Sequence, residues 1–332
     1  MTIRRFPGVG NQAARRGIFV GTRGSKLAMV QATSCVEALL ARHPALAVDL
    51  RVIETTGDQL LDGPLYEVGG KGLFIKELDV ALAQNQIQLA VHSMKDLPGE
   101  VAPGLVLAAI TERADPRDAL VSREGQTLAE LPPGAKVGTS SLRRRAQLLR
   151  QRADLEIVVV RGNVETRLRK LDEGQVDALL LACAGLDRLK LGYRITERLD
   201  TARFLPSPGQ GALGVVVRDK DLGTKSLAMG LTHVPSAMAV DSERALLKAI
   251  GGDCRVPIGA FATLDGGALH LEAEVLTPDG KQALRMAKDG FGSMADRVGE
   301  DLAQELLEAG AYDLLRETRA LLGTSDESPA GE

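Results

Sequence analysis

The chain has 332 residues, enough for two or three domains. Its hydrophobic fraction of 44% and charged fraction of 26% are ordinary for a globular protein. A net charge of −3 argues against general binding to nucleic acid or to an anionic membrane, and an aromatic fraction of 3% without Trp argues against base stacking. No segment is apolar and long enough to predict a membrane-spanning helix. We therefore expect neither nucleic acid nor a membrane as a partner.

The three cysteines, Cys35, Cys183 and Cys254, are far apart and form no C-x-x-C pair. This spacing predicts neither a disulfide framework nor a thiolate zinc site, and it is typical of a reducing compartment, so we expect a cytoplasmic location. The four histidines are scattered, and no metal site is predicted. The arginine-containing first sixteen residues lack an apolar core and do not resemble a secretory signal. Residues 1–16 and 323–332 are expected to be flexible tails.

From Gly17 onward, short apolar runs alternate with amphipathic segments. The pattern predicts strands at residues 18–20, 48–54 and 89–92, with helices between them. Ser25 is well placed to cap the first of these helices. This β-α-β rhythm indicates an α/β fold with much parallel pairing.

The rhythm restarts after a polar stretch at residues 111–117, which is typical of a linker. Further strands are predicted at residues 136–138, 156–160 and 177–182. A break rich in Pro and Gly at residues 206–211 then precedes a strand at 214–218. Two hinge-like crossings of this kind favour two lobes that the chain joins twice.

The last third of the chain has a different character. A helix is predicted at residues 238–250, strands follow at 256–261 and 268–276, and a long helical region covers 294–322. Strands grouped with flanking helices indicate a small α+β domain.

The segment of residues 136–170 contains ten Lys or Arg residues against three acidic ones. Gly, Ser, Thr and Asn accompany the arginines where strands are predicted to lead into helices, and such junctions bind anions through free backbone N–H groups, the helix dipole and guanidinium forks. We predict that a ligand with several negative groups is contacted by Arg143, Arg144, Arg161 and Arg167. Five other basic residues are interpreted as a solvated helix face: Arg145, Arg150, Arg152, Arg169 and Lys170.

Three further motifs leave alternatives open. Residues 92–96 (HSMKD) follow an apolar strand and could position an amine or a pyrrole N–H, although spacing alone favours a solvated loop with a local ion pair. Residues 69–72 (GGKG) are slightly better explained as a turn than as a lid in which Lys71 contacts an anion. Residues 209–214 match G-x-G-x-x-G, but they precede a strand, so a hinge loop is favoured over a dinucleotide site.

Cys254 follows two glycines and one aspartate in a predicted loop. An accessible loop cysteine is a candidate nucleophile or attachment site, although the motif alone does not decide this. Cys35 and Cys183 lie in apolar surroundings and are expected to be packing residues.

Taken together, these motifs resemble the porphobilinogen deaminase (hydroxymethylbilane synthase) family of tetrapyrrole biosynthesis. The resemblance covers residues 17–322 and consists of the loop cysteine and six segments in the same order: 22–25, 70–74, 92–96, 138–144, 161–163 with Arg167, and 209–212. It implies two doubly wound α/β lobes like those of bilobal, periplasmic-type binding proteins, and a small C-terminal α+β domain. The implied domains are residues 17–111 with 210–229, residues 112–209, and residues 230–322.

The resemblance also implies a transferase with one covalent dipyrromethane cofactor per chain, held by a thioether to Cys254. Four porphobilinogens are then added head to tail with loss of ammonia, and water releases hydroxymethylbilane. The expected partner is this small-molecule substrate, and the expected state is a monomer.

The family's functional residues carry over to this chain motif by motif. Asp96 and Lys95 match the catalytic residues. Cofactor binding is implied for Lys95, Thr139, Ser140, Ser141, Arg143, Arg144, Arg161, Arg188 and Cys254. Substrate binding is implied for Arg23, Ser25, Lys71, Phe74, Arg161, Arg167 and Gln210. Because every pyrrole unit carries an acetate and a propionate, the abundance of cations is chemically reasonable. The neighbouring cations would keep Asp96 ionised.

The chain departs from the family pattern at two positions. Asp253 precedes Cys254 where members often have glycine, and its carboxylate would disfavour a thiolate and slow cofactor attachment. Glu67 stands where some members have lysine. The main alternative is a bilobal solute-binding protein for a polycarboxylate or an oxyanion, which gives no role to Cys254. A weaker alternative is a regulatory ligand-sensing domain, which should carry a helix-turn-helix motif.

Overall fold

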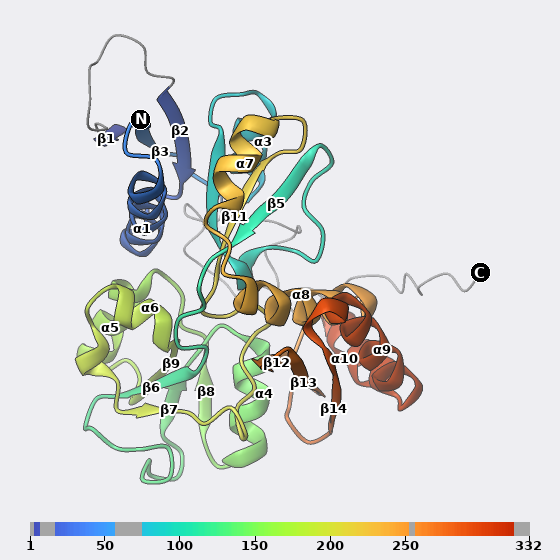
Figure 1. Cartoon of the computed structure of the whole chain (residues 1–332). Helices are drawn as coiled ribbons and strands as arrows, with labels where there is room; N and C mark the ends of the chain where they lie inside the picture. Colours follow the sequence, from blue (N-terminus) through green and yellow to red (C-terminus); the bar gives the residue numbers. More distant parts are fainter. Residues whose placement is uncertain (1–2, 7–16, 57–74, 252–255, 322–332) are drawn as a thin grey trace. The chain divides into compact units, whose positions relative to one another are not determined.

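The computed structural model describes residues 3–6, 17–56, 75–251 and 256–321 (Figure 1). The chain divides into two compact units, and it passes between them more than once. Unit 1 contains residues 1–61, 70–113 and 212–237, and unit 2 contains residues 62–69, 114–211 and 238–332. The predicted double crossing is therefore present.

Unit 1 is built on a six-stranded mixed sheet. In spatial order its strands are β1 (Ile3–Phe6), β3 (Ala47–Val52), β2 (Gly17–Thr22), β4 (Leu89–Ser93), β11 (Leu213–Arg218) and β5 (Leu105–Ile110). Strand β2 runs parallel to β3 and β4, whereas β11 is antiparallel to both β4 and β5. Residues 3–6, which the sequence placed in a terminal tail, pair with β3.

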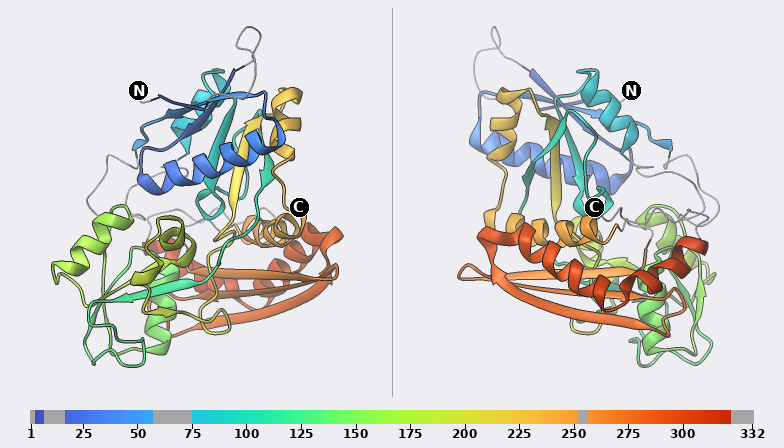
Figure 2. Two further views of the ribbon diagram at one scale, coloured as in Figure 1. Left: turned by 60° about the vertical axis from the view of Figure 1, so that its left-hand side comes forward. Right: turned by 90° about the vertical axis from the view of Figure 1, so that its right-hand side faces the viewer.

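Helices cover both faces of this sheet (Figures 1 and 2). Helices α1 (Lys26–Arg42) and α7 (Leu222–Met229) share one core with alternate strand residues such as Val20 and Leu50. Successive strand residues point to opposite faces, and a Cβ on Gly21 would meet the side chains of Leu78 and Ile87 at 3.0 Å or less. Leu78 belongs to α3 (Lys76–Ala83), which therefore packs on the other face.

Helix α1 begins where the sequence predicts. The Ser25 hydroxyl accepts a hydrogen bond from the Ala28 N–H at 3.3 Å, as a capping residue does. Its buried face is formed by residues spaced three or four apart: Gln31, Ala32, Cys35, Val36 and Leu39. The expectation that Cys35 is a packing residue is confirmed.

Unit 2 contains a five-stranded sheet. In spatial order its strands are β10 (Glu197–Arg198), β6 (Asp118–Ser122), β9 (Ala178–Ala182), β7 (Lys136–Gly138) and β8 (Glu156–Val158). Strand β7 is parallel to β8 and β9, and β6 is antiparallel to β9. Leu148 of α4 (Leu142–Gln151) packs in one core, and α5 (Val164–Asp172) and α6 (Cys183–Arg188) pack in a second. Alternate residues of β6 and β9 enter the two cores, so this sheet is also covered on both faces.

The same unit contains a three-stranded antiparallel sheet formed by β12 (Ile258–Asp265), β13 (Ala268–Leu276) and β14 (Ala283–Phe291). Helices α9 (Ala295–Glu308) and α10 (Ala311–Leu321) lie on one face of it (Figure 2). Helix α8 (Val234–Ala249) begins in unit 1 and continues in unit 2, where it joins the same core.

Two details of this region differ from the sequence prediction. The helical region is interrupted, because Gly310 has a φ of 101° between α9 and α10. Strand β14 was not predicted, and none of its nine residues is buried, so it lacks the apolar run on which the other strand predictions depend.

The predicted α/β fold, with two doubly wound lobes and a C-terminal α+β part, is confirmed. The boundaries of the three implied domains stay a prediction. Among the helices in the described ranges, none combines the length and the hydropathy needed to cross a bilayer.

Candidate active site

The topology of the five-stranded sheet brings several predicted site residues to one edge. Strands β7, β8 and β9 are mutually parallel, so the loops that follow them start from the same edge, where α/β sheets bind ligands. Thr139 follows β7 directly, and Arg161 lies shortly after β8. Strand β6 runs the other way, and its first residue, Asp118, lies opposite Ala182, the last residue of β9. Asp118 is therefore at this edge as well.

Two helices begin at this edge with side-chain caps. The Ser141 hydroxyl accepts a hydrogen bond from the Arg144 N–H at the start of α4, at 3.4 Å. The Asn163 side chain accepts one from the Thr166 N–H at the start of α5, at 2.8 Å. Gly162 has a φ of 111°, a conformation that favours glycine. Both helices direct the positive end of their dipole toward this edge.

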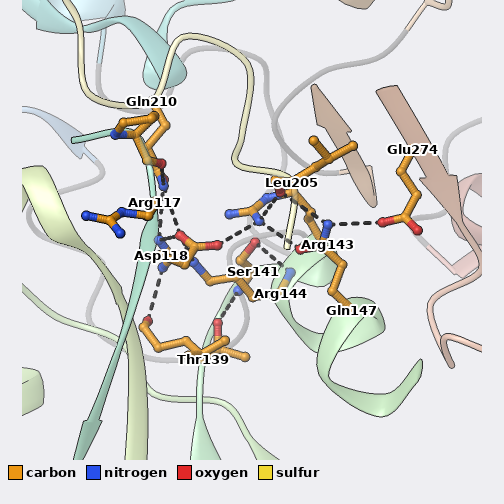
Figure 3. A network of polar contacts seen from close by, with 12 residues as sticks. Arg117, Asp118, Thr139, Ser141, Arg143, Arg144, Gln147, Leu205, Gln210 and Glu274 are labelled. Carbon is orange, nitrogen blue, oxygen red and sulfur yellow. Dashed lines mark hydrogen bonds and ion pairs between the residues drawn. The ribbon is translucent and has the colours of Figure 1, made fainter. Parts of the chain in front are cut away.

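Asp118 is the centre of the site (Figure 3). Its side chain is fully buried, and its carboxylate accepts four hydrogen bonds. Oδ2 accepts from Arg143 Nη1 at 2.7 Å. Oδ1 accepts from Arg144 Nε at 3.0 Å, from Arg144 Nη2 at 2.7 Å and from Gln210 Nε2 at 2.9 Å. Arg143, Arg144 and Gln210, which the sequence predicts to bind ligands, thus all donate to one carboxylate.

The protonation state of Asp118 follows from two opposing effects. Burial raises the pKa of its carboxyl, but the guanidinium groups of Arg143 and Arg144 outweigh burial and bring the pKa far below its ordinary value. Arg143 and Arg144 are themselves only 4% and 6% exposed. The cluster is therefore a buried carboxylate between two buried guanidinium groups.

Arg143 also connects this cluster to the three-stranded sheet. Its Nη1 donates to Gln147 Oε1 at 2.9 Å and to the Leu205 carbonyl at 2.7 Å. Gln147 Nε2 in turn donates to the Leu205 carbonyl at 3.1 Å and to Glu274 Oε2 on β13 at 3.2 Å (Figure 3). The network therefore joins β6, α4, the segment before Gln210 and β13 within unit 2.

Asp118, Gln147 and Glu274 belong to this network but are not predicted from the sequence. A signal for Asp118 was present, because it opens the run DALVS, in which every residue is buried. A charged residue in such a strand needs a partner, since an unpaired buried charge is very costly. The pairing with Arg143 and Arg144 would then have been a reasonable hypothesis.

The division of the basic run into ligand contacts and a solvated face is partly right. The side chains of Arg150 and Arg169 are 47% and 68% exposed, as predicted. The prediction is wrong for Arg152, whose guanidinium donates to the carbonyls of Leu128 and Leu131 at 2.7 Å and 2.8 Å. Arg152 therefore binds the segment that precedes β7 through its backbone carbonyls.

The other predicted residues of unit 2 lie close to the ends of the strands or in the loops beside them. Thr139 and Arg161 are buried, and Ser140 is half-buried. Arg167 Nε donates to the Gly162 carbonyl at 2.8 Å, and Arg188 Nη2 donates to the Gly211 carbonyl at 2.7 Å.

In unit 1, the predicted residues follow two neighbouring parallel strands. Arg23 and Ser25 come after β2, and Lys95 and Asp96 lie in a single 3₁₀ turn, η2 (Met94–Asp96), after β4. Arg23, Lys95 and Asp96 are each half-buried. Burial, with a smaller contribution from Arg23, lowers the pKa of His92 to about 4, so His92 is neutral near pH 7. Lys71, Phe74 and Cys254 lie outside the described residues, as do Glu67 and Asp253.

A doubly wound α/β lobe with buried arginines at the carboxyl ends of its parallel strands is an arrangement that suits an anionic ligand. The family model for the dipyromethane cofactor binding domain of porphobilinogen deaminase matches residues 18–226, and the model for the C-terminal domain of the same enzyme matches residues 237–308. The chain therefore belongs to the porphobilinogen deaminase family.

Curated relatives named porphobilinogen deaminase agree with these matches. The Desulforudis audaxviator protein is 49% identical over 92% of this chain and 99% of its own length. The Syntrophobacter fumaroxidans protein is 47% identical over 91% of this chain and 98% of its own length. The Pelobacter propionicus protein is 49% identical over 91% of this chain and 97% of its own length.

Solved periplasmic proteins are more distant. An arginine-specific periplasmic binding protein of Salmonella typhimurium covers 69% of this chain and 94% of its own, with 14% identity and a TM-score of 0.37. The BvgS periplasmic VFT2 domain of Bordetella pertussis covers 65% of this chain and 86% of its own, with 14% identity and a TM-score of 0.39.

The network predicts unequal costs for two arginine substitutions. Arg143→Leu removes one guanidinium group from a fully buried carboxylate, so the free energy of unfolding should fall by about 3 kcal/mol. Arg150→Leu removes an exposed group 3.9 Å from Glu274 and should cost less than about 1 kcal/mol. Urea unfolding of both variants measures this, with intact mass used to compare proteins in the same cofactor-loading state. Equal costs would show that the network is worth no more than a surface ion pair.

Proposed function

We propose that this chain is a porphobilinogen deaminase that acts as a cytoplasmic monomer. The reaction condenses four porphobilinogens head to tail on an enzyme-bound dipyrromethane primer with loss of ammonia, and hydrolysis then releases hydroxymethylbilane. The observation that carries the proposal is the pair of family matches, which together span residues 18–226 and 237–308. Because both matches are to the same enzyme, they favour it over the solute-binding alternative.

The residues of unit 2 fit a dipyrromethane, which carries four carboxylates. The guanidinium groups of Arg143 and Arg144 both pair with one carboxylate, that of Asp118, so these three side chains together carry a net positive charge. The Nε of Arg143 is buried and has no hydrogen-bond partner among the described residues. An unpaired buried donor is costly, and a ligand carboxylate would satisfy it. The site therefore suits an anionic group.

Two sets of side chains are proposed to bind the cofactor and the substrate. Carboxylates of the cofactor would be bound by Lys95, Thr139, Ser140, Ser141, Arg143, Arg144, Arg161 and Arg188, with Cys254 forming the thioether. Substrate would be bound by Arg23, Ser25, Lys71, Phe74, Arg161, Arg167 and Gln210. Guanidinium groups suit this role because they bind carboxylates through two parallel hydrogen bonds.

Asp96 is proposed to act on the substrate. Positive charge develops on the pyrrole of porphobilinogen as ammonia leaves, and a carboxylate beside the pyrrole N–H stabilises that charge. The same carboxylate accepts the pyrrole N–H as a hydrogen-bond donor, and Lys95 beside it binds a substrate carboxylate. When bound, the dipyrromethane supplies the free pyrrole position to which the first substrate is joined.

The proposed thioether at Cys254 predicts a specific mass. The purified protein should exceed its sequence mass by two porphobilinogens less two ammonias, and it should react with an aldehyde reagent for free pyrroles, with or without reductant. Cys254→Ser should lose both signals, because a serine hydroxyl is un-ionised at neutral pH.

Two cysteines serve as controls for this experiment. Cys35 and Cys183 are buried, and burial raises the pKa of the Cys183 thiol to about 12, so neither is a ready nucleophile. Cys35→Ser and Cys183→Ser should keep both signals. An unmodified mass in wild-type protein that still makes hydroxymethylbilane would exclude the attachment.

The proposed role of Asp96 predicts a loss of rate without a loss of cofactor. Asp96→Asn should keep the added mass but lose about a hundredfold or more in turnover, since one well-placed electrostatic group has been removed. Asp219→Asn, which changes a more exposed carboxylate that pairs with Lys225, should leave turnover unchanged. Rates of hydroxymethylbilane formation measure both. Near-normal turnover by loaded Asp96→Asn protein would remove Asp96 from the mechanism.

A further inference from the structure

We propose that Asp118 is a positioning residue for this reaction, and that its carboxylate sets the orientation of Arg143, Arg144 and Gln210. The inference rests on the proposed function, in which these three side chains contact the cofactor or the substrate. Asp118 itself is fully buried and touches no ligand in this proposal.

The hydrogen bonds of Asp118 exclude a direct catalytic role. An ionised carboxylate has about four lone-pair positions. In this structure four donors from three side chains bind the carboxylate at 2.7 to 3.0 Å, three of them at Oδ1 and one at Oδ2. Because Asp118 is fully buried and both of its oxygens already bind protein donors, it presents no exposed oxygen to a substrate. What it can do is hold its donors in place.

The two arginines are held differently. All three nitrogens of the Arg144 guanidinium have partners: Nε and Nη2 donate to Asp118 Oδ1, and Nη1 donates to the Leu180 carbonyl at 3.1 Å. These bonds fix the plane of the group. The three hydrogen bonds described for the Arg143 side chain all leave from Nη1, toward Asp118, Gln147 and Leu205. Its buried Nε has no partner among the described residues, which leaves this donor for a ligand.

Gln210 depends on the same carboxylate. Its Nε2 donates to Asp118 Oδ1 at 2.9 Å and to the Pro116 carbonyl at 2.7 Å, while its Oε1 accepts from Arg144 Nη2 at 3.4 Å. The side chain is 1% exposed, so these contacts decide which way the amide points. One carboxylate thus orients groups from α4 and from the loop before β11.

The negative charge matters as much as the shape. Two guanidinium groups that contact one buried carboxylate also repel each other, and the repulsion is strong where water is excluded. Asp118→Asn removes the charge that balances them and turns a donor toward one arginine. The guanidinium groups should then move apart. Asp118→Glu keeps the charge but places it one methylene further from the backbone.

The experiment compares Asp118→Asn and Asp118→Glu with a matched control. Asp221→Asn breaks another carboxylate–arginine pair, with Arg218 at 2.7 Å in unit 1, and asparagine still caps α7. For each protein, circular dichroism gives the folded fraction, intact mass gives the unloaded, loaded and partly elongated species, and porphobilinogen consumption gives kcat and KM. The control should match wild type in all of these.

A positioning role predicts a change in binding by folded protein. Asp118→Asn should raise KM or lower the loaded fraction by about tenfold or more, since small misplacements of binding groups are costly. Asp118→Glu should fold, accumulate partly elongated chains and show a smaller rise in KM. This variant decides the question if Asp118→Asn does not fold.

Two results separate failure of this inference from failure of the proposed function. If wild type is loaded and active while Asp118→Glu has a wild-type KM and mass distribution, with only the folded fraction and apparent kcat reduced, Asp118 is merely structural and the inference is overturned. If wild type itself carries no added mass and forms no hydroxymethylbilane, the proposed function fails, and the inference fails with it.

Discussion

The buried contact between Asp118 and the guanidinium groups of Arg143 and Arg144 is the constraint on which the rest of the site depends. None of these charges is appreciably exposed to water, so removing one of them leaves an uncompensated charge in the interior. Such a cluster is stable only when complete. The antiparallel run of β6 beside β9 therefore has a chemical consequence, because it brings Asp118 to the edge where α4 begins.

The same constraint bears on how an acidic protein would bind the proposed cofactor, which carries several carboxylates. The chain carries a net charge of −3, yet arginines gather where β7 and β8 lead into α4 and α5. Arg143, Arg144 and Arg161 are all buried, which strengthens their interaction with an anion compared with exposed side chains. Asp118 reduces the repulsion between Arg143 and Arg144, and it does not hydrogen-bond the Nε of Arg143. The network through Gln147 and Glu274 then links this site to the three-stranded sheet.

The sequence predicted those features that depend on local patterns. The α/β rhythm, the capping role of Ser25 and the strand-to-helix junctions at Thr139 and Arg161 could all be read from short runs of residues. The arginines themselves were identified because of their glycine and hydroxyl neighbours. The family resemblance came from the order of the same short motifs, and the family matches bear it out.

The features that the sequence did not predict depend on long-range contacts or on exposure. Asp118 meets Arg143 across 25 positions and Gln147 meets Glu274 across 127, and no local pattern joins such pairs. Asp118 directly follows residues 111–117, which the sequence predicts to be a linker, and it begins a buried strand. The sequence predicts a solvated face for Arg152. Its carbonyl partners lie more than twenty residues away, so the local pattern does not reveal them.

The most direct test of the account is a double-mutant cycle between Asp118 and Arg143. The free energy of unfolding in urea would be measured for wild type, Asp118→Asn, Arg143→Gln and the double variant, all in one cofactor-loading state. If the buried pair organises the site, the coupling free energy should be about 2 kcal/mol, with the double variant less destabilised than the sum of the single ones. Additive single effects, with a coupling below about 0.5 kcal/mol, would contradict the account.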